Sequence, residues 1–108
     1  MRFKFFIRKK SYLDKIEFKF NEPENTACIV CNHVLDNQHP ILYVTHDEDD
    51  GGWQFLCGQD DHTQDDAKII SLKQVVEIDQ TINELYDLPL GIGVMRNDVK
   101  SKWFTFKL

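Results

Sequence analysis

The sequence predicts an α+β fold, in which an antiparallel sheet, arranged as a meander, carries one or two helices packed on it. Two observations predict this class. Short segments that alternate apolar and polar side chains, or are rich in β-branched residues, recur along the 108-residue chain. Two later segments place apolar side chains at helical spacing behind capping residues. A chain of this length folds around one modest core.

The first part of the chain, residues 1–22, is predicted to form an N-terminal β-hairpin arm that precedes a main α+β domain over residues 23–108. Residues 3–8 and 15–20 alternate apolar with charged side chains, which is the strand period of two. Residues 21–25 break this pattern with a proline and turn-forming residues. The arm and the domain are expected to form one compact unit.

Three consecutive strands are predicted in the centre of the chain. Residues 26–35 and 41–45 are rich in β-branched and apolar side chains, and residues 53–57 are mostly apolar. The intervening segments 36–40 and 46–52 contain the proline, aspartates and glycines that turns use. Strands joined in this way indicate an antiparallel meander.

The last third of the chain is predicted to alternate strands with short helices. Residues 67–70 form a short strand, after which Ser71 can cap a helix and Asp79 a second one. Residues 90–96 are expected to be extended, with glycines that permit close packing, and residues 102–108 form a terminal strand. The second helix is expected to bury Ile82, Leu85 and Tyr86.

The distribution of charge is uneven along the chain. Residues 1–20 carry seven basic and two acidic side chains, whereas residues 21–80 carry two basic and thirteen acidic ones. An acidic surface repels nucleic-acid phosphates and attracts cations, so we expect a basic protein partner and no nucleic-acid ligand. A solvated face that aids solubility is the alternative interpretation.

The N-terminal segment, the length of the apolar runs and the number of cysteines indicate a cytoplasmic protein. The apolar patch at the start is interrupted by Lys4 and lacks a small-residue cleavage site, unlike a signal peptide. No apolar run has the length of a membrane span, so no membrane partner is expected. The three cysteines are an odd number, which is typical of a reducing compartment rather than of a disulfide scaffold.

Three thiols and an imidazole have spacings that a zinc site can use. Cys28 and Cys31 are separated by two residues, and Cys57 and His62 follow with four residues between them. Because Zn²⁺ commonly takes a Cys3His set, these four residues are the predicted metal ligands and zinc is the predicted cofactor. Buried core thiols are the competing interpretation, since unpaired cysteine is among the most buried residue types.

The ligand set itself stays open at this point. Cys28 and Cys31 would point to opposite faces of a regular strand, so joint chelation requires a bulge. His33 or His46 can also replace His62 as the imidazole ligand. Redox chemistry is disfavoured, because no helix is predicted to begin at the two closely spaced thiols and lower their pKa.

No sequence motif indicates catalysis. The chain lacks the nucleophile elbow, the phosphate-binding loop and the zinc-protease motif. Gly91 and Gly93 are not followed by the third glycine of a dinucleotide site, so tight packing is the prediction there. We therefore predict a protein without enzymatic activity.

Two acidic loops and a tryptophan form the predicted partner-binding surface. An aromatic anchor with an acidic rim is typical of an interface that binds a basic protein. A tryptophan on a strand is more often part of the core, so its exposure is the condition for this role. The predicted contact residues are Asp47, Glu48, Asp49, Asp50, Trp53, Asp60 and Asp61.

The string DGGWQFLCG, residues 50–58, resembles a family of small bacterial domains. The family was first catalogued as a domain of unknown function and is now grouped with the immunity proteins of polymorphic toxin systems, as the immunity-protein-thirty-three-like group. The resemblance runs from about Thr26 to Trp103. Its further elements are Ser71-Leu72, Ile78-Asp79, Leu88-Pro89-x-Gly91 and Arg96.

This resemblance implies a cytosolic α+β protein that binds and neutralises a cognate toxin without catalysis. The sequence leaves open whether the protein is a monomer or a dimer. The thiols and the N-terminal hairpin lie outside the shared pattern, so the resemblance does not support the metal site. The leading hypothesis is a non-enzymatic immunity protein with an acidic binding surface. A small zinc-binding structural or regulatory domain is the alternative, and a metal-dependent hydrolase is a weaker third.

Overall fold

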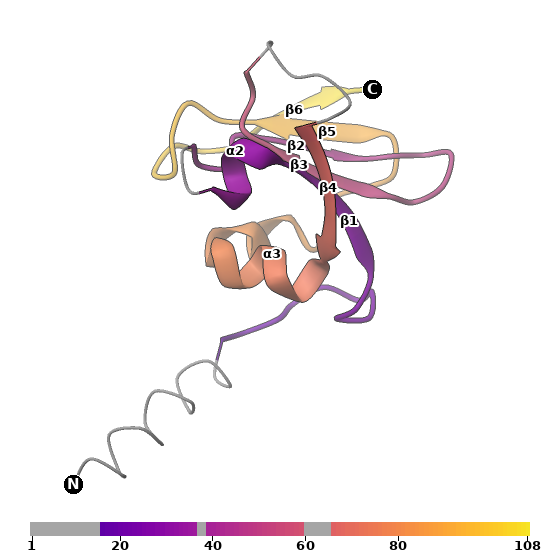
Figure 1. The fold of residues 1–108 in the computed structure, drawn as a ribbon. Helices are drawn as coiled ribbons and strands as arrows, with labels where there is room; N and C mark the ends of the chain where they lie inside the picture. The colour runs from indigo at the N-terminus through magenta and orange to yellow at the C-terminus, as the bar shows by residue number, and fades with distance from the viewer. Residues whose placement is uncertain (1–15, 37–38, 60–65) are drawn as a thin grey trace, which may run out of the picture.

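The computed structural model describes residues 16–36, 39–59 and 66–108 (Figure 1). No helix in these ranges combines the length and the apolar character that crossing a membrane requires. The elements, in chain order, are β1 (Ala27–Cys31), α2 (Asn32–Leu35), β2 (Tyr43–His46), β3 (Trp53–Leu56), β4 (Ala67–Ser71), α3 (Leu72–Ile78), the 3₁₀ helix η2 (Gln80–Leu85), β5 (Ile92–Met95) and β6 (Phe104–Lys107).

The strands form one six-stranded sheet in the order β4-β1-β3-β2-β5-β6. β1 and β3 are parallel, whereas the other neighbouring strands are antiparallel. The α+β class is confirmed, but the predicted purely antiparallel meander is wrong, because the sheet is mixed. The reason is that α2 separates β1 from β2, so no tight turn pairs those two strands and the β2–β3 hairpin places β3 beside β1 instead.

The segment after β1 is helical and not extended. The prediction of one strand over residues 26–35 is correct only as far as Cys31, after which a single helical turn begins at Asn32. The turn buries Val34, and the backbone N–H of Asp36 donates to the carbonyl of Asn32 at 2.8 Å. A helix of one turn is too short to leave a helical period in the sequence.

The caps predicted for the later helices are present. The hydroxyl of Ser71 accepts from the backbone N–H of Gln74 at 3.1 Å, and the Gln74 side chain accepts in return from the Ser71 N–H at 2.9 Å. This capping box fixes the start of α3. Asp79 caps η2, since its carboxylate accepts from the N–H of Thr81 at 2.9 Å.

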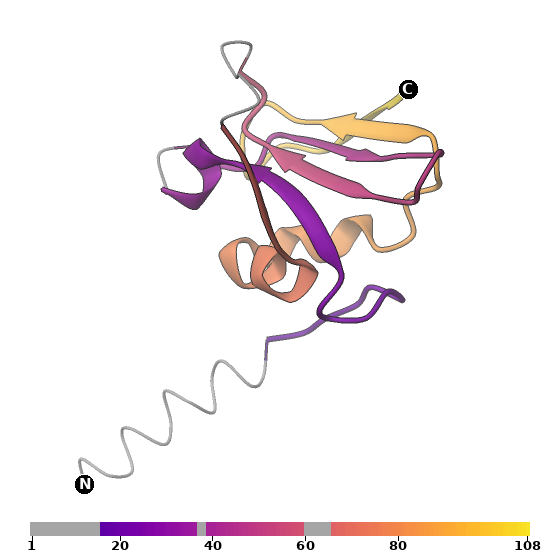
Figure 2. The ribbon, with the colours of Figure 1, turned by 45° about the vertical axis from the view of Figure 1, so that its right-hand side comes forward.

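The two helices α3 and η2 cover one face of the sheet (Figure 2). Ile82 and Leu85 are buried beneath η2 as predicted, but Tyr86 is 43% exposed, so its predicted burial is wrong. Tyr86 is the C-cap residue directly after η2.

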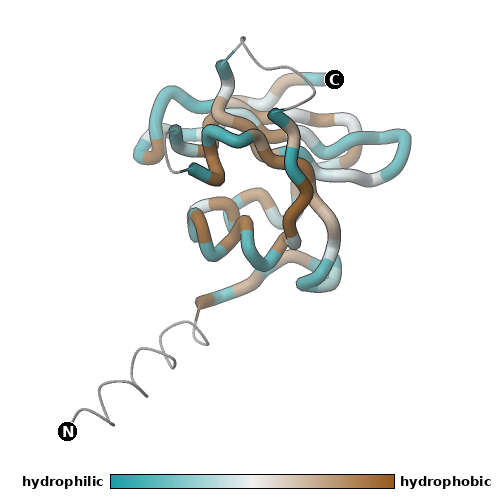
Figure 3. Tube along the Cα trace, in the orientation of Figure 1, coloured by the Kyte–Doolittle hydropathy of each residue, from teal (hydrophilic) through white to brown (hydrophobic). Residues whose placement is uncertain are grey.

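A row of apolar side chains forms the centre of the core on the helix-covered face. Val30, Val44, Phe55 and Val94 stand in register on the four inner strands, and each is at most 1% exposed. Figure 3 shows that hydrophobic residues concentrate in these strands and helices, whereas the β2–β3 loop is hydrophilic.

The opposite side of the sheet is called the open face below. Its side chains alternate with those of the core row, because successive residues of a strand point to opposite faces. In register from β4 to β6, the central row of the open face consists of Ile69, Ile29, Gln54, Thr45, Gly93 and Phe106.

The tight packing predicted at the two glycines is confirmed at Gly93. The ring of Phe106 occupies the space that a Cβ atom at Gly93 would need. The same ring contacts Tyr43, with 5.3 Å between ring centroids. This stack covers the β5–β6 side of the open face.

The N-terminal hairpin predicted over residues 1–22 falls mostly on residues 1–15, which lie outside the described residues. Residues 16–20 are described and form no strand. Phe20 is buried and meets Trp53 edge to face, with 5.2 Å between ring centroids. The division of the chain at residue 22 stays a prediction.

A buried guanidinium joins β5 to η2. Arg96 is 5% exposed and donates to the carboxylate of Asp79 at 2.8 Å and to the hydroxyl of Thr81 at 3.0 Å. It also donates twice to the carbonyl of Ile41, at 2.9 and 3.1 Å, and its guanidinium carbon lies 4.0 Å from the centroid of the Trp103 ring. These contacts hold the helices against the sheet.

Candidate functional site

The β2–β3 loop is held in one conformation by its own hydrogen bonds. The N–H of Asp47 donates to the carbonyl of Gly52 at 2.8 Å, and the N–H of Gly51 donates to the carbonyl of Asp47 at 3.0 Å. The Asp47 carboxylate accepts from the N–H of Asp49 at 2.9 Å, and that of Asp50 accepts from the N–H of Gly52 at 2.7 Å. Asp47 and Asp50 therefore shape the loop, and the loop presents its acidic side chains from a fixed backbone.

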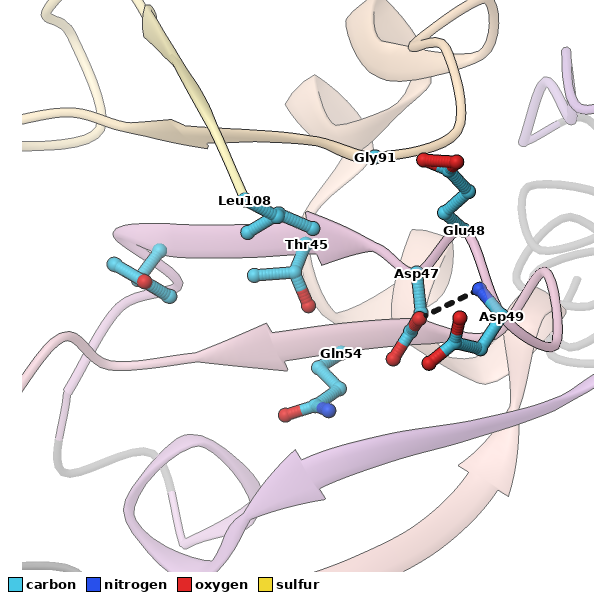
Figure 4. Close-up of a pocket in the computed structure, with 8 residues that line it drawn as sticks. Thr45, Asp47, Glu48, Asp49, Gln54, Gly91 and Leu108 are labelled. Carbon is cyan, nitrogen blue, oxygen red and sulfur yellow. Dashed lines mark hydrogen bonds between the residues drawn. The ribbon is translucent and has the colours of Figure 1, made fainter.

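A groove of about 530 Å³ opens beside this loop on the open face (Figure 4). Asp47 and Asp49 point toward Gln54, whereas Glu48 points to the other side, over Gly91. Gly91 has a φ of +80°, and a Cβ atom there would lie 3.1 Å from the Glu48 carboxylate. The floor and far wall of the groove are formed by Tyr43, Thr45, Gln54 and Leu108.

Three carboxylates around one groove create a negative potential where a cationic side chain can enter. A Lys or Arg side chain is long enough to place its stem against apolar groups while its charged end meets carboxylates. The groove therefore fits a basic side chain of a partner better than an anionic or apolar ligand.

A second, more apolar hollow of about 230 Å³ adjoins the groove. Ala27, Ile29 and Ile69 line it, and it shares Asp47 and Gln54 with the acidic groove. Ile69 is 72% exposed and Ile29 is 37% exposed. The two hollows are thus neighbours that share two lining residues, and together they combine negative charge with exposed apolar area.

The exposed ring expected of Trp53 is absent. Trp53 is 1% exposed, so its predicted role as a surface anchor is wrong. Its ring stacks on His46, with 3.9 Å between centroids, and its indole N–H donates to the Glu22 carboxylate at 2.7 Å. His46 Nδ1 lies 2.7 Å from the carbonyl of Leu88 and donates to it, because a carbonyl only accepts. Trp53 therefore supports the acidic loop from within the core of the protein.

Asp60, Asp61 and His62 were predicted from the sequence as site residues. All three belong to residues 60–65, which lie outside the described residues. Their roles stay predictions.

The predicted metal ligands do not all come together in the described part of the chain. Cys31 and Cys57 meet, and His33 joins them, so that their three ligand atoms lie within 4.8 Å of one another. Cys28 lies apart from this cluster, and its thiol donates to the carbonyl of Thr26 at 3.6 Å. The regular strand over Ala27–Cys31 explains the separation, since side chains three positions apart point to opposite faces.

All three cysteines are buried, and none of them forms a disulfide bond. Burial raises the pKa of the Cys28 thiol to about 12, and the negative charge of Glu22 adds to this effect. Burial also raises the pKa of the Cys57 thiol, with a further contribution from Cys31. A reactive cysteine has the opposite tendency, a lowered pKa at an exposed site.

Several residues of the groove were missed by sequence reasoning. Tyr43, Gln54 and Leu108 belong to three different predicted strands. Alternation indicates which side chains share a face within one strand. The pairing of strands from distant parts of the chain decides which side chains then become neighbours, and a single sequence does not show that pairing.

These features define the class of the protein: a small α+β domain whose mixed sheet has helices on one face and an acidic, hollowed open face on the other. The model of the Immunity protein Imm33 domain matches residues 28–107, so the chain belongs to this family. No curated protein and no solved structure matches the chain. The family resemblance found in the sequence is confirmed, and membership supports an immunity role and implies, in general terms, a toxin partner.

Proposed function

We propose that this protein neutralises a cognate toxin in the cytoplasm by binding a basic patch on it through the open face, without catalysis. The observation that carries the proposal is the acidic groove, which shares lining residues with a neighbouring apolar hollow. A stoichiometric inhibitor needs such a complementary surface and no reacting groups.

Charge supports the choice of a basic partner. Three carboxylates border the groove, and the whole chain has a formal net charge of −5. A toxin that acts on nucleic acid carries a basic surface, and an acidic inhibitor can mimic the phosphates of that substrate. Opposite charges also steer the two proteins together and raise the association rate, an effect that salt weakens.

The apolar hollow supplies the part of the interface that excludes water. Stable interfaces have an apolar centre surrounded by polar groups, and most of the binding energy comes from a few buried side chains. Ile29 and Ile69 lie next to the acidic groove with exposed side chains, so a partner can bury them while its basic groups meet the carboxylates.

The test uses the double variant Glu48→Gln with Asp49→Asn. These two side chains border the groove, and the loop hydrogen bonds described above use the carboxylates of Asp47 and Asp50 instead. We expect binding of the cognate toxin domain, once it is identified, to weaken at least about tenfold at low salt and less at high salt. Calorimetry at two salt concentrations and growth rescue by co-expression measure this loss.

The matched control is Glu77→Gln with Glu84→Gln, which removes the same charge from exposed positions of α3 and η2. Its affinity is expected to stay within about twofold of the unmodified protein, because the helices cover the other face and distant surface charges are screened. Equal losses for both variants would show that net charge, and not the groove, determines binding.

A second variant tests the apolar hollow. Ile69→Thr on β4 is expected to weaken binding by about 1 kcal/mol or more through lost apolar contact, with little change in stability because Ile69 is 72% exposed. Ile78→Thr on α3 is the control, since Ile78 is 40% exposed on the helical side. Unchanged affinity for Ile69→Thr would exclude the hollow from the interface.

A further inference from the structure

The side chains of Cys31, His33 and Cys57 meet at the end of the sheet opposite the acidic loop. β1 and β3 are direct parallel neighbours, with Val30 beside Phe55, so both strands end on the same side of the sheet. Cys31 is the last residue of β1, Cys57 directly follows β3, and His33 lies in α2 immediately after β1. The topology thus joins two chain segments that are far apart in sequence.

The distances in this cluster fit a single metal ion. Both sulfur atoms and a ring nitrogen lie within 4.8 Å of one another, and the Sγ of Cys57 is 3.8 Å from the Nδ1 of His33. Tetrahedral zinc, with bonds of about 2.3 Å to sulfur and about 2.0 Å to nitrogen, separates two sulfurs by roughly 3.8 Å and a sulfur from a nitrogen by roughly 3.6 Å. Shifts of up to about 1 Å, within the reach of side-chain rotation, are enough to complete this geometry.

The donor set selects the kind of ion. Thiolate sulfur and imidazole nitrogen suit Zn²⁺, whereas Ca²⁺ and Mg²⁺ require oxygen ligands. Cys31 and Cys57 are each 2% exposed, and His33 is half-buried. Both sulfur ligands are therefore shielded from solvent.

We propose that Cys31, His33 and Cys57 bind one Zn²⁺ ion. The ion would tie the ends of β1 and β3 to α2 and stabilise the parallel pairing of the two strands. This set differs from the predicted set of Cys28, Cys31, Cys57 and His62, because His33 is a ligand and Cys28 is not, while His62 lies outside the described residues. The three ligands lie at the end of β3 away from the β2–β3 loop, and none of them lines the acidic groove, so zinc binding and toxin binding can be tested with separate variants.

The experiment measures zinc in protein purified without a metal-affinity tag and kept reduced. We expect about one equivalent per chain by mass spectrometry of the metal, and a rise in the melting temperature of at least about 5 °C when Zn²⁺ is added to chelator-treated protein. Cobalt in place of zinc should give charge-transfer absorption from the thiolates and ligand-field bands of a four-coordinate ion.

Three variants identify the ligands. Cys57→Ser and His33→Gln should each lower zinc occupancy to below about a tenth, whereas Cys28→Ala, which removes a buried thiol outside the cluster, should keep about one equivalent. His33 is half-buried, so its variant is expected to fold even if Cys57→Ser does not. Protein without zinc, or zinc that survives His33→Gln or is lost with Cys28→Ala, would overturn the proposal.

Discussion

Two groups of charged side chains in this molecule differ in what they contact. Arg96 is 5% exposed and its guanidinium is shared among Asp79, Thr81 and the carbonyl of Ile41. The acidic side chains of the β2–β3 loop, in contrast, border an open groove. A charge that is buried and paired inside the protein holds the fold together, whereas charges left at the surface of a fixed loop are available to a partner.

The largest effect expected from this contrast follows from Arg96→Met. The variant keeps most of the apolar stem but removes the guanidinium that donates to the Ile41 carbonyl and to Oδ2 of Asp79, whose Oδ1 still accepts from Thr81. Removing one partner of a buried pair typically costs about 3–5 kcal/mol, and the Asp79 side chain is 16% exposed, so we expect about 3 kcal/mol. Urea unfolding followed by circular dichroism measures the loss.

Arg96→Lys and the double variant Arg96→Met with Asp79→Asn refine this test. Lysine keeps the charge but lacks the planar fork that reaches several acceptors at once, so it should restore only part of the stability. The double variant should lose less than the sum of the two single changes, because the two residues interact directly. A loss below about 1 kcal/mol for Arg96→Met would contradict a fold-holding role for this charge.

The elements that were predicted well depend on local physics. The caps at Ser71 and Asp79 follow from side chains that bond to backbone groups two or three residues away. The parallel pairing of β1 with β3 was not predicted, since it depends on contacts between segments more than twenty residues apart in sequence. The alternation of each strand is compatible with several neighbours, so the order of the strands stays undetermined at that level.

The same distinction applies to the candidate site. The acidic loop is a contiguous run between two strands, so its location at a hairpin tip could be predicted from residues 46–52 alone. The burial of Trp53 depends on Glu22 and His46, which approach it from other parts of the chain. The joining of His33 to the thiols similarly depends on α2, a helix too short for its period to be detected.

A medium effect is expected at Glu22, whose partly buried carboxylate accepts from the indole N–H of Trp53 and lies 3.8 Å from Nε2 of His46. Glu22→Ala leaves the buried indole N–H of Trp53 without this acceptor, and an unsatisfied buried donor costs about 1–3 kcal/mol. Glu22→Gln keeps an oxygen acceptor of the same length and should cost less than half as much. Urea unfolding of both variants gives the comparison, and equal losses would show that the hydrogen bond is not the source.

The smallest effect is expected at Asp98, which combines an exposed charge with bonds to its own turn. Its carboxylate accepts from the N–H of Lys100 at 2.8 Å and from the Ser101 hydroxyl at 3.0 Å, and these bonds lower its pKa below the ordinary value. A lowered pKa in the folded state contributes stability above the unfolded pKa of about 3.9, and this contribution is lost as the pH falls through the folded pKa. Asp98→Asn should therefore flatten the decline in stability on the acid side of about pH 4, measured by urea unfolding across that range, and Ser101→Ala should flatten it less. If stability declines on the acid side of about pH 4 equally in Asp98→Asn and in the unmodified protein, an exposed carboxylate bonded only to its own turn contributes nothing to the fold. Asp98 would then resemble the charges of the β2–β3 loop and not Arg96.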